Sequence, residues 1–502
     1  MPNTIPTEAN LKAGAEAAQN SARNNAQNSA QNNIKAALHQ AQLSCQAEQW
    51  SAVIAACKTA IAQSQQCLEL APATHPPKQQ ASTQQTAAIL HQAKGDLFKS
   101  QGDLTAAIAS YQQALALAPE ANEVKTALGE AYLAKAAQLE QTGDVTAAVQ
   151  NYLQAIAQSP YLFTAYSRLR YNLLRYNIPR KDPRLLEVIE SCQRIVAKHL
   201  NIRPARITLG YALTKSGQLP EAIACYRSIT GSPEEQRRPP DFIIIGAEKS
   251  GTTSLHQYLK LHPQVVAPIE KEIDFFDLEY GCGLEWYLSH FPSASATKTA
   301  QTNWITGETS ANYLYDDAAP ARIFEHFPQI KLVAILRDPV DRTVSRYNMM
   351  VRNGAEKRSL EAAIAEEISH IQKATDKDGD IQWNALNRCR HIGNSLYYHH
   401  LKRWLALFSR QQLLVLQSED LFSQPQQTMQ QLYQLIGLTE DCPQQKYPQH
   451  NAGKYKPADA DVRQQLSDFF APHNDKLETL LNQSFRWPSA NPKTTPAPSS
   501  MP

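Results

Sequence analysis

The stretch DFIIIGAEKSGTTSLHQYL, Asp241–Leu259, indicates the architecture of the second half of the chain. An apolar run, Phe242–Gly246, precedes a glycine-bearing loop, and a segment with helical spacing of apolar residues follows the loop. A buried strand, a glycine loop and a helix place several backbone N–H groups at the helix N-terminus, where an anion is stabilised. The stretch therefore predicts an anion-binding loop.

The lysine of this loop is displaced from its usual position. The phosphate loop of nucleoside triphosphatases reads G-x-x-x-x-G-K-[ST]. Gly246 and Gly251 have that separation, but Thr252 and Thr253 follow the second glycine directly, and Lys249 lies before it. The pattern therefore disfavours a phosphate-loop kinase and indicates a different phosphate-bearing ligand.

Two further apolar runs complete the pattern of an α/β domain. KLVAILR, Lys331–Arg337, and QLLVLQ, Gln412–Gln417, are bounded by turn residues and separated by helical segments. Runs of this kind are typical of buried parallel strands. We therefore expect a P-loop-type parallel sheet flanked by helices.

The residues at the end of the run Lys331–Arg337 argue for an anion rather than a metal. Asp338 follows the strand, at the place of a magnesium-binding aspartate, but Arg337 stands directly before it. A guanidinium beside a magnesium ligand is electrostatically unfavourable, whereas it suits a phosphate that is gripped bidentately. The site is predicted to bind its anion without a metal.

One short sequence pattern, the repeated phrase, recurs in the first half of the chain. It begins near Gln49, Gly102, Gly143 and Gly217, and each copy has a small turn followed by Ala and by Ile or Val one helical turn apart. The phrase resembles the tetratricopeptide repeat, a helix–turn–helix unit of about 34 residues. The spacing is imperfect and residues 161–205 lack the phrase, so a generic helical domain stays an alternative.

Composition shifts divide the chain. A Pro-rich, charged segment separates the helical half from the α/β half, and both ends of the chain have polar, low-complexity sequences. The predicted parts are a disordered segment (1–33), an all-α repeat solenoid (34–230), a linker (231–240), the α/β domain (241–487) and a disordered tail (488–502).

Overall composition narrows the class of protein. A net charge of +2 over 502 residues is no polybasic field, which disfavours nucleic-acid binding. The eight cysteines form no C-x-x-C pair, which favours reduced thiols over disulfides or a zinc site. The first residues lack the apolar core of a secretory signal, and no apolar run reaches roughly 18 residues. We expect a cytoplasmic protein without a membrane span.

Several motifs together resemble one enzyme family. IIIGAEKSGTTSLHQYLKLHPQV, 243–265, and KLVAILRDPVDRTVSRYNMM, 331–350, are similar to the sulfotransferases that use 3′-phosphoadenosine 5′-phosphosulfate (PAPS), above all the heparan sulfate type. KEIDFFD, 271–277, and the closing FRW, 485–487, also resemble that family. The resemblance runs from about 241 to 487.

The resemblance implies a role for each motif. Lys249 would contact the oxygen that bridges phosphate and sulfate, where charge builds as the bond breaks. Arg337 and Ser345 would bind the 3′-phosphate, and Lys454, in a late loop, would cover the cofactor. The remaining loop residues would hold the 5′ end of PAPS: Ser250, Gly251, Thr252, Thr253 and Ser254. No metal is implied.

The resemblance also implies a general base. Glu272 aligns with the family's catalytic glutamate, and a glutamate beside aromatic residues is expected to be desolvated, which suits proton transfer. His256 and His262 are rival bases. Arg342 is expected to pair with a neighbouring aspartate, Asp338 or Asp341. Glu308 stands where several relatives have a lysine that faces cofactor and acceptor.

The sequence therefore predicts an enzyme, a PAPS-dependent sulfotransferase that acts by in-line transfer on a hydroxyl, or less readily an amine, of a carbohydrate or glycolipid. A protein-tyrosine acceptor and a catalytically inactive repeat scaffold are the alternatives. The repeats imply a protein partner or self-association.

Overall fold

The computed structural model of the protein describes residues 77–175, 178–199, 201–232, 234–294, 304–438, 447–450 and 458–487. Four sequence predictions lie outside these residues, namely those for segment 1–33, the repeat phrase at Gln49, Lys454 and the tail 488–502. The chain divides into two compact units, Met1–Gln218 and Leu219–Pro502.

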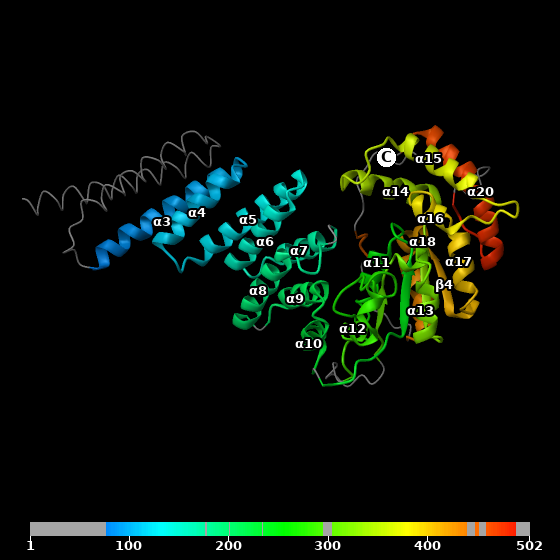
Figure 1. The fold of residues 1–502 in the computed structure, drawn as a ribbon, viewed down its shortest axis with the longest axis horizontal. Helices are drawn as coiled ribbons and strands as arrows, with labels where there is room; N and C mark the ends of the chain where they lie inside the picture. The colour runs from blue at the N-terminus through cyan, green and yellow to red at the C-terminus, as the bar shows by residue number, and fades with distance from the viewer. Residues whose placement is uncertain are drawn as a thin grey trace, which may run out of the picture. The chain divides into compact units, whose positions relative to one another are not determined.

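The first unit is built of helices that pack as antiparallel neighbours (Figure 1). The pairs α3–α4, α5–α6 and α8–α9 each make extensive contacts. The bounds are α3 Pro77–Ser100, α4 Leu104–Leu117, α5 Asn122–Thr142, α6 Val145–Gln158, α7 Phe163–Arg175, α8 Pro183–Lys198 and α9 Arg203–Ser216. The expected all-α architecture is confirmed for the described part of this unit.

The repeated phrase encodes the turn within a helix pair. Gly102 and Gly143 have φ angles of 81° and 86°, in the left-handed region that glycine adopts most easily. Asp103 and Asp144 follow them as N-caps of α4 and α6, and each carboxylate accepts a 3.0 Å hydrogen bond from the N–H three residues later. These caps stabilise the start of the second helix of each pair.

Glycines inside the helices allow the paired helices to approach closely. A Cβ atom at Gly95 would lie 2.5 Å from the ring of Tyr111, which is fully buried. A Cβ atom at Gly129 would lie 2.9 Å from Leu162. A side chain at Gly95 would therefore clash with the buried Tyr111 ring, and one at Gly129 would require Leu162 to move.

Helix α10, Leu219–Thr230, carries the last copy of the repeated phrase but belongs to the second unit. Its Tyr226 ring lies 4.1 Å from the ring of His290 and 6.2 Å from that of Trp286. The hydroxyl of Thr230 donates to the carbonyl of Ser289 at 3.3 Å. The division between units therefore lies before α10, whereas the sequence placed it after this helix.

The segment expected as a linker, 231–240, has specific contacts in its described part. Arg237 forms an antiparallel bridge with Ser293. Its guanidinium is buried and donates to three backbone carbonyls at 2.9 Å each. Because these bonds tie the segment to the second unit, the chain is held to it before β1 begins.

A four-stranded parallel sheet forms the centre of the second unit (Figure 1). The strand order is β2-β1-β3-β4, and the register pairs Ile243 with Leu332 and Ala334 with Val415. The strands are β1 Phe242–Gly246, β2 Gly307–Thr309, β3 Lys331–Leu336 and β4 Leu413–Gln417. The three parallel strands expected from the sequence are confirmed, and β2 was not foreseen.

Helices pack against the sheet and against one another. Ile244, Val333 and Leu416 of the sheet form one core with Leu255 of α11 and Leu432 of α19. A second core joins α14, α15 and α20. The bounds are α11 Thr252–Leu259, α12 Leu284–Leu288, α13 Ala319–His326, α14 Pro339–Arg352, α15 Leu360–Lys373, α16 Trp383–Arg388, α17 Tyr397–Leu405, α18 Ser418–Ser423, α19 Pro425–Ile436 and α20 Ala460–Leu481.

This architecture confirms the α/β fold expected from the sequence. Within the described residues, every helix is too short or too polar to cross a bilayer.

Candidate active site

The carboxyl ends of β1, β3 and β4 open into a cavity of about 830 Å³. Ligands of parallel α/β sheets bind at this edge, because the loops that follow the strands meet there. The cavity is lined by Glu248, Lys249, Gly251, Thr252, Thr253, Lys271, Glu272, Ala311, Asn312, Arg337, Asp341, Ser345, Met349, Ser418, Glu419, Phe422, Gln449 and His450.

The loop after β1 has the backbone shape of an anion cradle. Lys249 and Gly251 have φ angles of 70° and 101°, both in the left-handed region. A Cβ atom at Gly251 would lie 3.2 Å from the ring of Phe422, so the position is restricted by space as well as by conformation. Gly251 is the N-cap of α11 and makes no side-chain cap, which leaves Thr252 and Thr253 at the cavity. The first N–H groups of a helix favour an anion there.

The Lys249 ammonium lies among other cations. Burial lowers its pKa from the ordinary lysine value, and the guanidiniums of Arg352, Arg337 and Arg342 lower it further. The carboxylate of Glu248 opposes these effects. An ammonium in such surroundings gains much from a bound anion, because the anion offsets the repulsion.

Arg337 and Ser345 lie at the same cavity as Lys249. Arg337 Nη1 donates to the carbonyl of Lys249 at 3.5 Å, and its Nη2 lies 3.8 Å from a carboxylate oxygen of Asp341. Asp341 also pairs with Arg463 of α20 at 2.8 Å. The predicted 3′-phosphate residues and the predicted lysine are therefore brought together, although their roles stay predictions.

Arg342 has other partners than the sequence suggested. It is fully buried, and it donates at 2.6 Å both to the hydroxyl of Ser395 and to the carbonyl of His391. Asp338 instead caps α14, and Asp341 faces Arg337. The prediction that Arg342 pairs with either aspartate is wrong, because its position on α14 directs it into the core.

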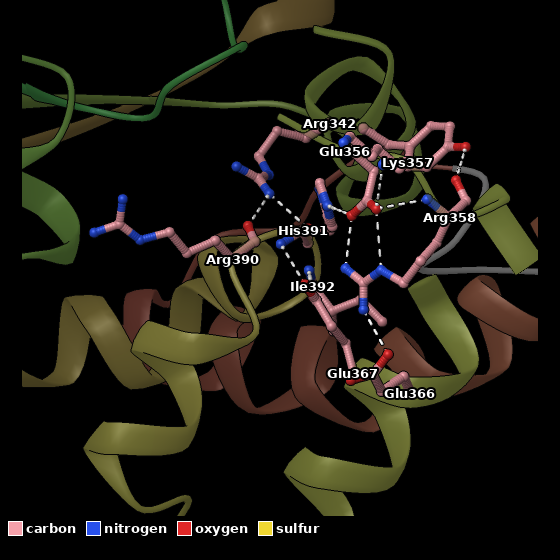
Figure 2. Close-up of polar contacts among 10 residues, drawn as sticks. Arg342, Glu356, Lys357, Arg358, Glu366, Glu367, Arg390, His391 and Ile392 are labelled. Atoms are coloured by element: carbon pink, nitrogen blue, oxygen red, sulfur yellow. Dashed lines mark hydrogen bonds and ion pairs between the residues drawn. The ribbon is translucent and has the colours of Figure 1, made fainter. Parts of the chain in front are cut away.

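Figure 2 shows the network that fixes the turn beneath Arg342. Glu367 accepts hydrogen bonds from the N–H groups of His391 and Ile392 at 3.3 Å and 2.8 Å. The carboxylate of Glu356 joins His391 to Arg358, and hydrogen bonds from Arg358 hold the pKa of Glu356 well below its usual range. These bonds stabilise the turn whose carbonyls hold Arg342.

The predicted base, Glu272, lines the cavity in an open position. Its φ angle is 64°, and its N–H donates to the carbonyl of Thr309 at 2.9 Å. Its side chain is 47% exposed and pairs with the ammonium of Lys271. The expectation that the neighbouring aromatic residues desolvate Glu272 is wrong, because Phe275 and Phe276 are buried in a separate aromatic cluster.

The rival histidines lie outside the lining of the cavity. His256 is buried with its Nδ1 3.1 Å from the hydroxyl of Thr309, and burial lowers its pKa to about 4. His262 is buried against the ring of Tyr433 and accepts from the N–H of Gln264. Both side chains are structural, which leaves Glu272 as the carboxylate best placed to reach an acceptor.

A cluster of buried acids stands behind Glu272. Glu308 is fully buried, and burial raises its pKa well above the ordinary value. It lies outside the lining of the cavity, although it stands where several relatives have a lysine that faces cofactor and acceptor. Burial, with the neighbouring Asp277 and Glu272 carboxylates, raises the pKa of Asp274 to about 7. The sequence KEIDFFD shows that several acidic residues lie close together, but only the fold shows which of them are buried.

Two loop serines do not line the cavity, and their predicted role in holding the 5′ end of PAPS stays a prediction. Ser250 and Ser254 are fully buried and lie outside its lining. Ser254 accepts a 3.0 Å hydrogen bond from the N–H of His450, which ties residues 447–450 to α11. The sequence reasoning missed Glu248 and Glu419, which do line the cavity.

Comparison with known proteins agrees with this geometry. Residues 239–457 match the model of the sulfotransferase domain. This part of the chain is therefore similar to sulfotransferase domains. Residues 95–135, which include α4 and parts of α3 and α5, match a TPR repeat. The resemblance to both families is thereby confirmed.

Similar proteins carry the same domain in other contexts. The chain is 26% identical over 316 residues to the membrane-associated sulfotransferase kil1 of Dictyostelium discoideum, covering 49% of this chain and 66% of that protein. It is 30% identical over 272 residues to the bifunctional heparan sulfate N-deacetylase/N-sulfotransferase 4 of Mus musculus, covering 49% of this chain and 30% of that protein. A crystal structure of a sulfotransferase from Alicyclobacillus acidocaldarius aligns over 49% of this chain and 98% of its own, with 26% identity and a TM-score of 0.39. The chain thus spans less than a third of the heparan sulfate relative.

Proposed function

We propose that the protein is a PAPS-dependent sulfotransferase that transfers a sulfuryl group to a hydroxyl, or an amine, of a carbohydrate or glycolipid. The observation that carries the proposal is the convergence of Lys249, Arg337, Ser345 and Glu272 on one cavity of the sulfotransferase domain. These residues come from three different segments, and only the fold brings them together.

The residues present fit a donor with two separate anionic groups. The loop after β1 offers Lys249, a left-handed Gly251 and the N-terminus of α11 to one group. Arg337 and Ser345 offer a guanidinium and a hydroxyl to the other, which suits a 3′-phosphate. When bound, PAPS would supply the sulfuryl group, and adenosine 3′,5′-bisphosphate would be the leaving group.

The protein's own contribution is proton transfer and charge stabilisation. Glu272 accepts the proton that the acceptor hydroxyl loses, and its half-exposed carboxylate is accessible to an acceptor that arrives from solvent. The Lys249 ammonium stabilises the negative charge that develops on the leaving phosphate oxygen. Lys271, already paired with Glu272, holds that carboxylate at the cavity.

The relatives' names support a carbohydrate acceptor, because several of them are heparan sulfate N-sulfotransferases. The match to a TPR repeat supports a protein partner or self-association through the first unit. A cytoplasmic location stays a prediction. A protein-tyrosine acceptor and an inactive scaffold remain the alternatives that experiment must exclude.

The deciding experiment is isothermal titration with adenosine 3′,5′-bisphosphate in EDTA. We expect metal-free binding by the wild-type chain and at least about tenfold weaker binding by Arg337→Ala, because the guanidinium grips the 3′-phosphate. Arg388→Ala removes an exposed arginine that does not line this cavity and serves as the matched control. Absence of binding by the folded wild type would overturn the proposal, and binding only of ATP with magnesium would favour a kinase.

Turnover is tested with radiolabelled PAPS and a panel of saccharides, glycolipids and tyrosine peptides. Glu272→Gln keeps the shape of the side chain but removes the base, so we expect bisphosphate binding within about twofold of wild type and sulfate transfer reduced by about 100-fold or more. A wild-type chain that binds the bisphosphate but transfers sulfate to none of the acceptor classes would favour the scaffold.

A further inference from the structure

Glu248, the residue before Lys249, is the meeting point of two arginines from α14. Its Oε2 forms an ion pair with Arg346 Nη1 and lies 4.0 Å from Arg342 Nη1. The Glu248 side chain is 20% exposed and lines the same cavity as Lys249. One carboxylate therefore stands between the α14 cations and the cavity lysine.

The two arginines are buried, so their charges depend on this carboxylate. Arg342 is fully buried and Arg346 is 7% exposed. Burial lowers the pKa of Arg346, and the Glu248 carboxylate opposes that effect. Arg342 Nη1 and Arg346 Nε have no hydrogen-bond acceptor among the described residues. Buried guanidiniums without a counter-charge are costly, which fixes Glu248 in place.

The same carboxylate acts on Lys249. The Lys249 backbone has a φ angle of 70°, and Arg337 contacts its carbonyl. Among the charged neighbours that act on the ammonium, Glu248 is the one that favours the protonated form. The other three, Arg337, Arg342 and Arg352, all disfavour it. The ion pairs of Glu248 with Arg342 and Arg346 are therefore expected to determine how strongly the Glu248 carboxylate stabilises the protonated form of Lys249.

Other ionisable groups surround this arrangement. Tyr315 is buried and interacts with both Glu248 and Arg342, and burial raises its pKa to about 12. The remaining charged or titratable groups that line the cavity are Asp341, Lys271, Glu272, Glu419 and His450. None of these is altered by the substitutions below.

We propose that Glu248 is a positioning residue that sets the placement and the charge of Lys249, and that Arg346 controls how strongly it does so. The inference concerns the same site and rests on the proposed role of Lys249 in stabilising the leaving group. It adds two residues, Glu248 and Arg346, to the set that determines the rate.

This arrangement has a distinctive consequence. Removing the Glu248 charge removes the carboxylate that favours the protonated lysine, so the pKa of Lys249 falls. Removing the Arg346 charge frees the Glu248 carboxylate to act on Lys249, so the lysine pKa rises. A merely structural salt bridge would give the same result, loss of stability, for either partner. Opposite shifts distinguish the two explanations.

The test measures the protonation of Lys249 directly. The full-length chain is labelled with acetic anhydride over a range of pH, and mass spectrometry follows acetylation of Lys249, with exposed Lys377 as the internal reference. We expect Glu248→Gln to lower the labelling midpoint by about one pH unit, which is roughly a tenfold rise in reactivity below the midpoint. Arg346→Gln should raise the midpoint, and the double variant should label like Glu248→Gln, because Arg346 acts on Lys249 through the Glu248 carboxylate.

Circular dichroism identifies variants that fail to fold. Glu248→Asp keeps the charge and is expected to label like wild type. If Glu248→Gln does not fold, Arg346→Gln decides alone, since a raised midpoint supports the proposal and an unchanged or lowered one overturns it. Midpoints that shift in the same direction in both single variants also overturn it.

The labelling result is separate from the proposed function, because it needs no ligand. A wild-type chain that fails to bind adenosine 3′,5′-bisphosphate would reject the sulfotransferase proposal while the midpoints still report on Glu248. If the chain is active, the alkaline limb of the kcat/KM profile should move with the labelling midpoint in each variant.

Discussion

The indole N–H of Trp487 donates a 3.1 Å hydrogen bond to Glu419 Oε2. The other oxygen of Glu419 accepts from the N–H of Asp338 at 3.0 Å. Trp487 is buried and stacks on Phe485 at 4.2 Å. The end of the described chain thus holds a carboxylate at the cavity and, through it, the start of α14.

Trp487→Phe is expected to destabilise the second unit by about 1–3 kcal/mol, because it leaves a half-buried carboxylate oxygen without its donor. Urea unfolding followed by circular dichroism measures the loss. Trp383→Phe is the matched control, since the ring N–H of Trp383 has no hydrogen-bond partner among the described residues. Equal losses in the two variants would mean that ring packing, and not this hydrogen bond, matters.

Gly251→Ala should weaken binding of adenosine 3′,5′-bisphosphate by at least about tenfold and cost about 1–3 kcal/mol of stability. The φ angle of 101° disfavours any side chain, and the added methyl group would meet Phe422. Titration calorimetry and thermal unfolding measure the two effects. Gly281→Ala, in open space, provides the control, and an equally tight Gly251→Ala variant would contradict the anion-loop interpretation.

Asp274→Asn should stabilise the protein more at pH 8 than at pH 5. The folded-state pKa of Asp274 is raised from the ordinary 3.8 to about 7, mainly by burial. Between those values the folded state holds a proton that the unfolded state has lost, so stability falls as pH rises through this range. Asparagine removes that cost and tolerates the left-handed φ angle of 52°.

We expect the gain for Asp274→Asn to be about 1–3 kcal/mol larger at pH 8 than at pH 5, measured by urea unfolding at both pH values. Asp378→Asn, at an exposed aspartate, should show no such difference. A gain that does not change with pH would indicate that the Asp274 carboxyl is not buried in solution.

Tyr226→Ala should destabilise the second unit by about 3–5 kcal/mol, because it removes a fully buried ring that packs on His290 and Trp286. Thermal unfolding of the full-length chain, with bisphosphate binding as the readout for this unit, measures the effect. Tyr161→Ala, whose ring is 65% exposed, should change stability by about 0.5 kcal/mol or less.

The strands and the cavity were largely predictable because their signals are local. An apolar run followed by a glycine loop places Lys249 at the end of β1, and the next apolar run places Arg337 at the end of β3. Parallel strands bring their carboxyl ends to one edge, so these two residues had to meet. Strand β2 was missed because Gly307–Thr309 is too short to show periodicity.

The partners of individual side chains were not predictable in the same way. Arg342 was expected to pair with a sequence neighbour, but its hydrogen bonds go to residues about fifty positions away. Glu272 was expected to be covered by aromatic residues, yet those rings pack on Tyr287 and Tyr313 instead. Such contacts depend on which elements pack together, which a single sequence does not reveal.

The placement of α10 affects how this protein's parts can be exchanged. By its sequence the helix is the last repeat, but Tyr226 and Thr230 contact residues of the second unit. A chimera that cuts the chain after Thr230 would therefore remove part of the interior of the second unit. A different repeat array can replace the natural one only if the junction lies before Leu219. That junction falls inside a segment whose sequence looks like a single repeat.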